Sequence, residues 1–329
     1  MLAVALHRCS QSRISRWLSR PAHAKEGTHL KPPSVVPTIL SLPRGRSLAL
    51  AGTRHVMGIL NATPDSFWEG SRVSGAEAAA RTALAMLRAG ASILDIGGES
   101  TRPGSAYLSA EEEIARVEPA IRAVRAAAAA EGLDPVLSVD TRKAAVARAA
   151  LEAGADLVND VSALEDDPDL AGLCAERGVP VILMHKKGVP ATMQNAPWYE
   201  DCAGEVRDYL LAAADRARAA GIPGDRILLD PGIGFGKRLE DNLDLLGRLA
   251  ELRAHGYPVV VGLSRKSFLG ALTGRAVEER LAGSIAAACA AFLGGADVFR
   301  VHDVPETVDA LKVFGAILGR TAAEGKGTP

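Results

Sequence analysis

The sequence predicts a (β/α)8 TIM barrel, an α/β fold in which eight parallel strands alternate with eight helices. From residue 48 onward, short β-branched or apolar runs alternate with longer stretches rich in alanine and leucine at helical spacing. Eight such units of fairly even size favour a closed barrel over its rival, an open doubly wound sheet. The chain has 329 residues, of which 48% are hydrophobic, and this length and composition suit one large domain.

The start of the chain is expected to lie outside the barrel. Residues 1–34 carry six lysines and arginines, five of them before the first acidic residue, Glu26, a composition that fits either a targeting segment or a disordered extension, or a misassigned start codon. The barrel is assigned to residues 35–320 and a tail to residues 321–329. A short N-terminal β-hairpin over residues 47–52 is expected to plug the bottom of the barrel.

The expected strands are short and apolar. They cover residues 55–60, 92–96, 136–139, 157–159, 179–184, 227–230, 259–263 and 298–301. The expected helices cover residues 76–89, 110–130, 143–153, 170–177, 200–220, 239–254, 277–293 and 305–318. Ser109 and Glu112 form a possible capping box, and four glycines stand where helices should end: Gly90, Gly154, Gly178 and Gly221.

Composition narrows the class of protein. The 38 lysines and arginines nearly balance the 39 acidic residues, so no general positive field would attract nucleic acid or an acidic membrane. No apolar run reaches the roughly 18 to 20 residues that a membrane span needs. The four cysteines are far apart and lack metal-ligand spacing, so they are interpreted as free thiols in a reducing compartment.

Polar residues follow nearly every expected strand, where a buried parallel strand would otherwise stay apolar. Burying polar groups costs roughly 1 to 3 kcal/mol each when they lack partners, and active sites of barrel enzymes lie at this rim, so these residues predict a site. They are Asn61, Asp95, Asp140, Asn159, His185, Asp230, residues 264–266, Arg300 and His302.

Two groups within this set predict what binds. Asp140, Asn159 and Asp230 would project from three strands into the barrel mouth, where two carboxylates and an amide suit the edge of a planar 2-amino-4-oxo heterocycle. Arg300 and His302 share one side of the last strand and lie next to the end of the first, so together they can grip an anion. The open alternative for Arg300 is an ion pair with an acid such as Asp297 or Asp303.

The most specific local sequences occur in a fixed order. They are MGILNATPDSF at residues 57–67, DIGGESTRPG at 95–104, SVDT at 138–141, NDVS at 159–162, DPGIGFGK at 230–237, SRKS at 264–267 and RVHDV at 300–304. Over roughly residues 47–320 the chain resembles the dihydropteroate synthase family. The resemblance implies a transferase of folate biosynthesis, a sulfonamide target, that condenses (7,8-dihydropterin-6-yl)methyl diphosphate with p-aminobenzoate to give 7,8-dihydropteroate and diphosphate.

The resemblance also implies roles for single residues. It places Asp95, Met184 and Lys266 beside the pterin with the three residues above, although core packing remains open for Met184. It implies that Asn61 ligates a Mg²⁺ ion bound to the diphosphate. It further implies that Lys266, Arg300, His302 and Arg102 are the catalytic residues, that Asn61, Arg102, Arg300 and His302 hold the diphosphate, and that Thr101 and Ser267 receive p-aminobenzoate.

In the implied mechanism the diphosphate leaves first and the amine attacks a pterin methylene cation, so no protein nucleophile is needed. Two rim loops over residues 63–74 and 97–109 are expected to be mobile lids. The resemblance implies a homodimer. A cytoplasmic location is expected, or a mitochondrial one if residues 1–34 are a transit peptide.

The chain departs from the family pattern in two places. Trp68, Glu69 and Ser71 are unusual in the first loop, which could change lid conformation or sulfonamide sensitivity. Lys186 and Lys187 add positive charge near the rim and are expected to be solvated rather than catalytic. Two rival functions remain: a methyltransferase domain that takes a folate methyl group to a corrinoid protein, and a catalytically silent pterin-binding barrel.

Overall fold

In a computed structural model the protein is described over residues 39–50, 53–62, 72–99, 107–189 and 192–324. Within these ranges eight parallel strands form one sheet in the order β8-β7-β6-β5-β4-β3-β10-β9. A parallel bridge between Leu229 and Val259 joins the two outer strands, so the sheet curls into a nearly closed barrel and the predicted fold is confirmed. The strands are β3 (His55–Asn61), β4 (Ile93–Gly97), β5 (Val136–Asp140), β6 (Leu157–Asp160), β7 (Val181–Met184), β8 (Ile227–Asp230), β9 (Val260–Gly262) and β10 (Val298–Val301).

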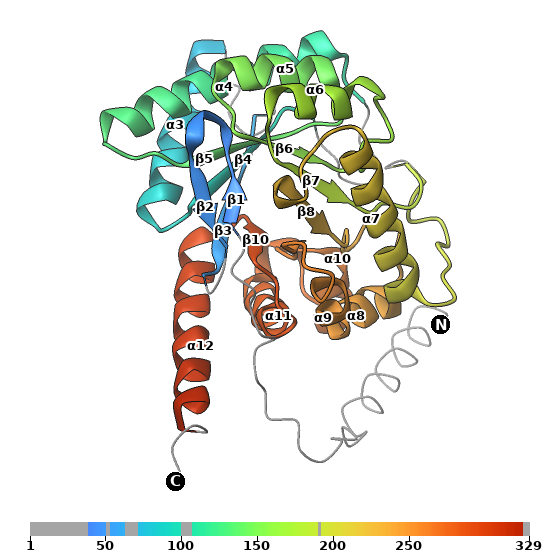
Figure 1. Cartoon of the computed structure of the whole chain (residues 1–329). Helices are drawn as coiled ribbons and strands as arrows, with labels where there is room; N and C mark the ends of the chain where they lie inside the picture. Colours follow the sequence, from blue (N-terminus) through green and yellow to red (C-terminus); the bar gives the residue numbers. More distant parts are fainter. Residues whose placement is uncertain (1–38, 51–52, 63–71, 100–106, 190–191, 325–329) are drawn as a thin grey trace, which may run out of the picture.

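Helices surround the strands (Figure 1). They are α3 (Arg72–Arg88), α4 (Ala110–Ala130), α5 (Ala144–Ala153), α6 (Asp169–Arg177), α7 (Cys202–Ala219), α8 (Leu239–Gly247), α9 (Leu249–Arg253), α10 (Ser267–Thr273), α11 (Leu281–Leu293) and α12 (Val304–Glu324), with 3-10 turns η1 (Pro43–Gly45), η2 (Gly224–Arg226) and η3 (Val277–Glu279). The helix expected over residues 239–254 is split, because Arg248 leaves helical geometry at φ −114° and ψ 17°.

The predicted helix ends are confirmed. The Ser109 side chain accepts from the Glu112 backbone N–H, and the Glu112 carboxylate accepts from the Ser109 N–H, which completes the capping box of α4. The four glycines that follow helices all adopt positive φ angles.

The barrel is packed from two sides. One hydrophobic cluster fills the space between the sheet and its helices, and a second fills the amino-terminal end of the barrel. In the second, Leu40, Leu42 and Leu50 pack against strand residues such as Met57 and Ile93. The expected plug is therefore present, but the hairpin pairs β1 (Ile39–Ser41) with β2 (Ser47–Ala49) instead of lying within residues 47–52.

Several expectations fall on residues outside the described ranges: the extension at 1–34, Cys9, and most of the rim loops, including Trp68, Glu69, Ser71, Thr101 and Arg102. The described Cys174, Cys202 and Cys289 are free, as expected. The last helix continues to Glu324, past the expected domain end at residue 320. None of the helices in the described ranges combines the length and apolarity that a membrane crossing requires.

Candidate active site

Two carboxylates, from β4 and β5, bind one arginine from β10, and an amide from β6 binds one of these carboxylates. Arg300 donates from Nε to Asp95 Oδ2 at 2.6 Å and from Nη2 to Asp140 Oδ2 at 2.7 Å. Asn159 Nδ2 donates to the same Asp95 oxygen at 3.0 Å. Because Asp95, Asp140 and Asn159 are all buried, the guanidinium offsets negative charge inside the barrel.

The alternative partners considered for Arg300 are wrong. Asp297 pairs with Arg253 at 2.9 Å, and Asp303 pairs with Arg265 at 2.5 Å. The pairing of Arg300 with Asp95 could not be predicted from local sequence, because 205 residues separate the two along the chain.

An inner pocket opens beside this cluster and brings together most of the residues predicted to bind a ring. Asp95 stands behind it, fully buried, where its Oδ2 holds Asn159 and Arg300 in place. The inner pocket is lined by Asp140, Asn159, Val161, Met184, Asp230, Gly232, Ile233, Phe235, Gly262, Lys266 and Arg300.

Burial shifts the titration of the inner pocket. It raises the pKa of Asp140 to about 7, with Arg300 opposing the shift and the nearby Asp95 adding to it. Burial also raises the pKa of Asp230, although the Gly232 N–H donates to this carboxylate at 2.7 Å. It lowers the pKa of Lys266 to about 8, against the attraction of Asp230. The pocket therefore holds groups that change charge near neutral pH.

Lys266 is presented by a tightly held turn after β9. Its Nζ donates to the Ile233 carbonyl oxygen at 2.7 Å and lies 4.1 Å from the centre of the Phe235 ring. The preceding Arg265 has a φ of +58°, a strained value for a residue other than glycine. Arg280 Nη1 donates to the carbonyl oxygens of Arg265 and Lys266 at 3.1 and 3.4 Å, so it fixes the turn from behind.

From the DPGIGFGK motif only Asp230 was predicted to lie in the site, but Gly232, Ile233 and Phe235 also line the inner pocket. Their membership of the same motif is the sequence feature that could have identified them. Arg280 was missed as well, and nothing in its local sequence pointed to the turn that it supports.

An outer cavity of about 870 Å³ continues from the inner pocket. Asp140, Phe235, Lys266 and Arg300 line both spaces. The outer cavity also contains Asn61, Glu99, Met193, Ser264, Ser267, His302 and Asp303. Because β10 pairs with β3 in parallel, the expected neighbourhood of Asn61, Arg300 and His302 is confirmed.

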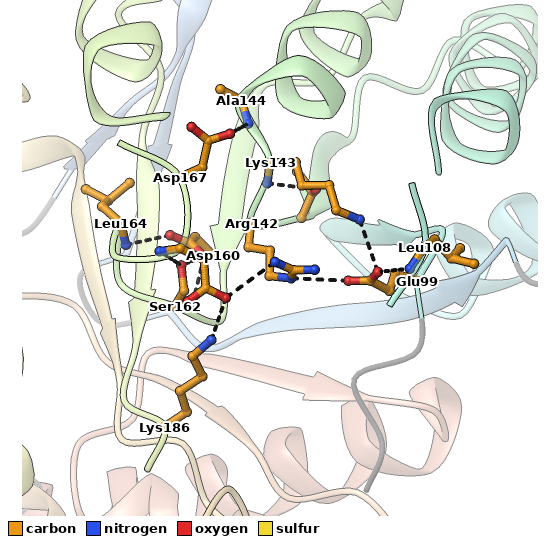
Figure 2. Close-up of polar contacts among 12 residues, drawn as sticks. Glu99, Leu108, Arg142, Lys143, Ala144, Asp160, Ser162, Leu164, Asp167 and Lys186 are labelled. Atoms are coloured by element: carbon orange, nitrogen blue, oxygen red, sulfur yellow. Dashed lines mark hydrogen bonds and ion pairs between the residues drawn. The ribbon is translucent and has the colours of Figure 1, made fainter. Parts of the chain in front are cut away.

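Ion pairs and hydrogen bonds gather around Glu99, which lines the outer cavity, and continue to Lys186 (Figure 2). Glu99 accepts from Lys143 Nζ at 3.0 Å, from Arg142 Nε at 3.3 Å and from the Leu108 backbone N–H at 2.6 Å. Lys186 Nζ donates to Asp166 Oδ2 at 2.7 Å, and its side chain is only 14% exposed. The expectation that Lys186 is solvated is therefore wrong, because a carboxylate partner at the rim draws it in.

Lys187 is exposed, as expected, and donates to the Trp198 carbonyl oxygen at 2.6 Å. No group of three or more His, Cys, Asp or Glu side chains in the described ranges is arranged to hold a metal ion. The candidate metal ligand, Asn61, opens instead into the outer cavity with Arg300 and His302.

Comparison with known proteins gives consistent results. A family model described as "Pterin binding enzyme" matches residues 57–302. The dihydropteroate synthase of Escherichia coli (strain K12) is 46% identical over 275 residues, which cover 84% of this chain and 95% of that protein.

Solved structures agree in both fold and sequence. Dihydropteroate synthase from Xanthomonas albilineans with 4-aminobenzoic acid is 46% identical, has a TM-score of 0.78, and the match covers 86% of this chain and 98% of that one. The Xanthomonas albilineans enzyme in complex with 7,8-dihydropteroate is 44% identical, with a TM-score of 0.74 and coverage of 85% and 98%.

Proposed function

The chain belongs to the dihydropteroate synthase family of pterin-binding enzymes. On this basis we propose which substrate binds in the inner pocket and which binds in the outer cavity. It is a transferase of folate biosynthesis that condenses (7,8-dihydropterin-6-yl)methyl diphosphate with p-aminobenzoate, forming 7,8-dihydropteroate and releasing diphosphate. The observation that carries this function is that the ordered rim motifs line one continuous space. The 46% identity to a dihydropteroate synthase weighs against the two alternative functions, the folate methyltransferase and the catalytically silent pterin-binding barrel.

The inner pocket is assigned to the pterin ring. Asp140, Asn159 and Asp230 offer acceptors and an amide to the ring's polar edge, which is a geometrically selective contact. Met184 and the alkyl stem of Lys266 contribute pocket wall. Asp95 acts from behind by orienting Asn159 and Arg300.

The diphosphate is assigned to the junction of the inner pocket with the outer cavity. Arg300 lines both spaces and would supply positive charge, and His302 and Asn61 line the outer cavity and would supply hydrogen bonds. Ser264 Oγ lies 3.1 Å from His302 Nδ1 and fixes the orientation of the imidazole. Arg102 is proposed to complete this group and lies outside the described residues.

Mg²⁺ is proposed to bind together with the diphosphate at Asn61. One amide oxygen suits this ion, which usually keeps few protein ligands and completes its shell with phosphate and water. When bound, the ion neutralises charge on the departing diphosphate. The role of the chain is to place Asn61 beside the cationic Arg300.

The amine substrate is assigned to the outer cavity. Ser267 at the start of α10 would receive p-aminobenzoate next to Lys266, and Thr101, outside the described residues, would help. The bond between the methylene carbon and the diphosphate oxygen breaks, which leaves a pterin methylene cation. The amine nitrogen of p-aminobenzoate attacks this cation and then loses a proton to solvent.

The direct test uses the full chain with dihydropterin methyl diphosphate, labelled p-aminobenzoate and Mg²⁺. Labelled dihydropteroate is expected to form, to fall to background with a chelator, and to return when Mg²⁺ is restored. Absence of product from a chain that still binds the pterin diphosphate would contradict the function and favour the silent barrel.

We also propose a homodimer, and a barrel domain that begins near residue 35 and includes the last helix to Glu324, with a separate extension before it and a tail after it. A cytoplasmic location is proposed. The alternative is import into mitochondria, if residues 1–34 act as a transit peptide. Light scattering of the purified chain tests the dimer. A reporter fused behind residues 1–34 tests import.

A further inference from the structure

The loop that follows β8 is built around alternate glycines. Gly232, Gly234 and Gly236 have φ angles of +66°, +83° and +63°, which side chains rarely tolerate. Such a backbone cannot continue a strand or a helix, so its carbonyl oxygens need other donors.

Side chains supply those donors. Lys266 donates to the Ile233 carbonyl at 2.7 Å, Gln194 to the Gly234 carbonyl at 2.5 Å, and Tyr199 to the Gly236 carbonyl at 2.9 Å. Within residues 232–236 the other two carbonyls, of Gly232 and Phe235, both accept from Lys237 Nζ, at 2.9 and 3.1 Å, and the Gly232 carbonyl also accepts from the Phe235 backbone N–H at 3.1 Å. Lys237 therefore anchors the two ends of the segment that forms the pocket wall.

Lys237 approaches the loop from its buried side. It is 3% exposed, and its Nζ also lies 2.9 Å from His185 Nδ1 and 3.4 Å from the His185 carbonyl oxygen. Burial lowers the pKa of His185 to about 2, so the imidazole is neutral and its Nδ1 can accept. The three backbone carbonyl oxygens around Nζ are acceptors and suit an amine or ammonium donor, and burial lowers the pKa of Lys237 to about 7, so both forms occur near neutral pH.

The loop also rests directly on the backbone that follows β7. A Cβ atom at Gly232 would lie 1.9 Å from the His185 carbonyl oxygen, and one at Gly236 would lie 2.2 Å from the Lys187 carbonyl oxygen. Lys237 thus ties the loop to the end of β7 at the place where the two backbones touch.

This anchoring bears on two pterin contacts. The Gly232 N–H donates to Asp230, and the Ile233 carbonyl accepts from Lys266, so the positions of both charged side chains depend on the loop. Two lysines hold the same loop from opposite sides: Lys266 from the pocket and Lys237 from the protein interior.

We propose that Lys237 is a positioning residue for pterin recognition, which acts by fixing the loop of residues 231–237 so that Asp230 and Lys266 face the ring together. The proposal rests on the assignment of the inner pocket to a pterin. It requires no contact between Lys237 and either substrate.

The test compares Lys237→Met with the full wild-type chain by calorimetric titration with 6-hydroxymethylpterin, alongside steady-state kinetics. Loss of the hydrogen bonds that Lys237 Nζ donates to the Gly232 and Phe235 carbonyl oxygens is expected to weaken pterin binding roughly tenfold or more. The KM for p-aminobenzoate is expected to change much less. Lys312→Met is the matched control, since it removes an exposed lysine of α12 that lies outside the loop and both pockets, and it should bind pterin as the wild type does.

Lys237→Gln, which keeps an N–H donor, should weaken binding less than Lys237→Met. Cooperative thermal unfolding establishes that each variant is folded. Wild-type pterin affinity in folded Lys237→Met overturns the proposal, as does an equal loss for both substrates or failure of both variants to fold, because Lys237 would then serve the fold as a whole. A wild-type chain that binds no pterin refutes the proposed function instead.

Discussion

At the scale of single residues, Arg300 does more than the sequence predicts. Its Nε and Nη2 groups bind Asp95 and Asp140, so the residue assigned to the diphosphate also controls carboxylates assigned to the ring. Two carboxylates share one guanidinium: burial raises the pKa of Asp140, the Arg300 guanidinium opposes the shift, and the neighbouring Asp95 carboxylate adds to it. The ring site and the diphosphate site are therefore electrostatically linked.

One prediction concerns pH. Burial raises the pKa of Asp140 to about 7, so its carboxylate forms only above that pH, and burial lowers the pKa of Lys266 to about 8, so its ammonium persists only below that pH. Since kcat/KM reports the free enzyme, its value for the pterin substrate should rise and then fall between about pH 5.5 and about pH 9.5.

The Asp140→Asn variant is the control for the acidic limb of this profile. It should lose the rise on the acidic side and retain the fall on the alkaline side. A flat wild-type profile over this range would remove both groups from recognition of the free substrate.

A second residue prediction concerns Asp230. Asp230→Asn keeps an oxygen for the Gly232 N–H but loses the charge that faces the ring, so the fold should survive while pterin affinity falls roughly tenfold or more. Calorimetric titration measures the loss. The exposed Asp225→Asn serves as the control, and wild-type affinity in Asp230→Asn would exclude Asp230 from ring recognition.

At the scale of elements, the β1–β2 hairpin is fastened to the barrel by one buried carboxylate. Asp156, which is fully buried, binds Arg44 and Arg46 of the hairpin region and Arg125 of α4. Its Oδ2 also accepts from the Leu137 backbone N–H at 3.0 Å. The plug is thus held by charge as well as by its leucines.

Asp156→Asn should lower the free energy of unfolding by about 3 kcal/mol, because three arginines lose a buried partner. Chemical denaturation measures this loss, and kcat should stay near the wild-type value, since the plug lies at the end of the barrel away from the pocket. Asp134→Asn is the control, because its side chain is 67% exposed and such surface pairs contribute little. Equal stability of the two variants would show that the leucines alone hold the hairpin.

Elements were predicted best where periodicity was long or strongly apolar. The limits of α4, β8 and β10 match the expected residues. The short α10 was not expected, because its seven residues, SFLGALT, contain a glycine and span less than the periodicity needed for detection. The arm of the hairpin over residues 39–41 was missed for the same reason.

At the scale of the whole molecule, the sequence predicted the barrel and most of the residues that line its mouth, since alternation and strand ends are local properties, but Asp95 and His185 of the predicted set line neither pocket. It could not predict pairings such as Arg300 with Asp95, or Lys186 with Asp166, because these arise only when separate strands close into a ring. The role of Lys237 was hidden for a similar reason, because its partner His185 comes from the preceding strand.

The end of the barrel that the β1–β2 hairpin closes is a suitable place to join a tag or another protein. Ile39 stands at that end, because the adjacent Leu40 packs in the plug and Ser41 binds Asp225 just before β8 at 2.6 Å. Lys266 and Arg300 open toward the opposite end. An affinity tag, a solid support or a second enzyme joined ahead of Ile39 would therefore leave the entrance clear, so this architecture suits fusion and immobilisation without redesign of the pocket.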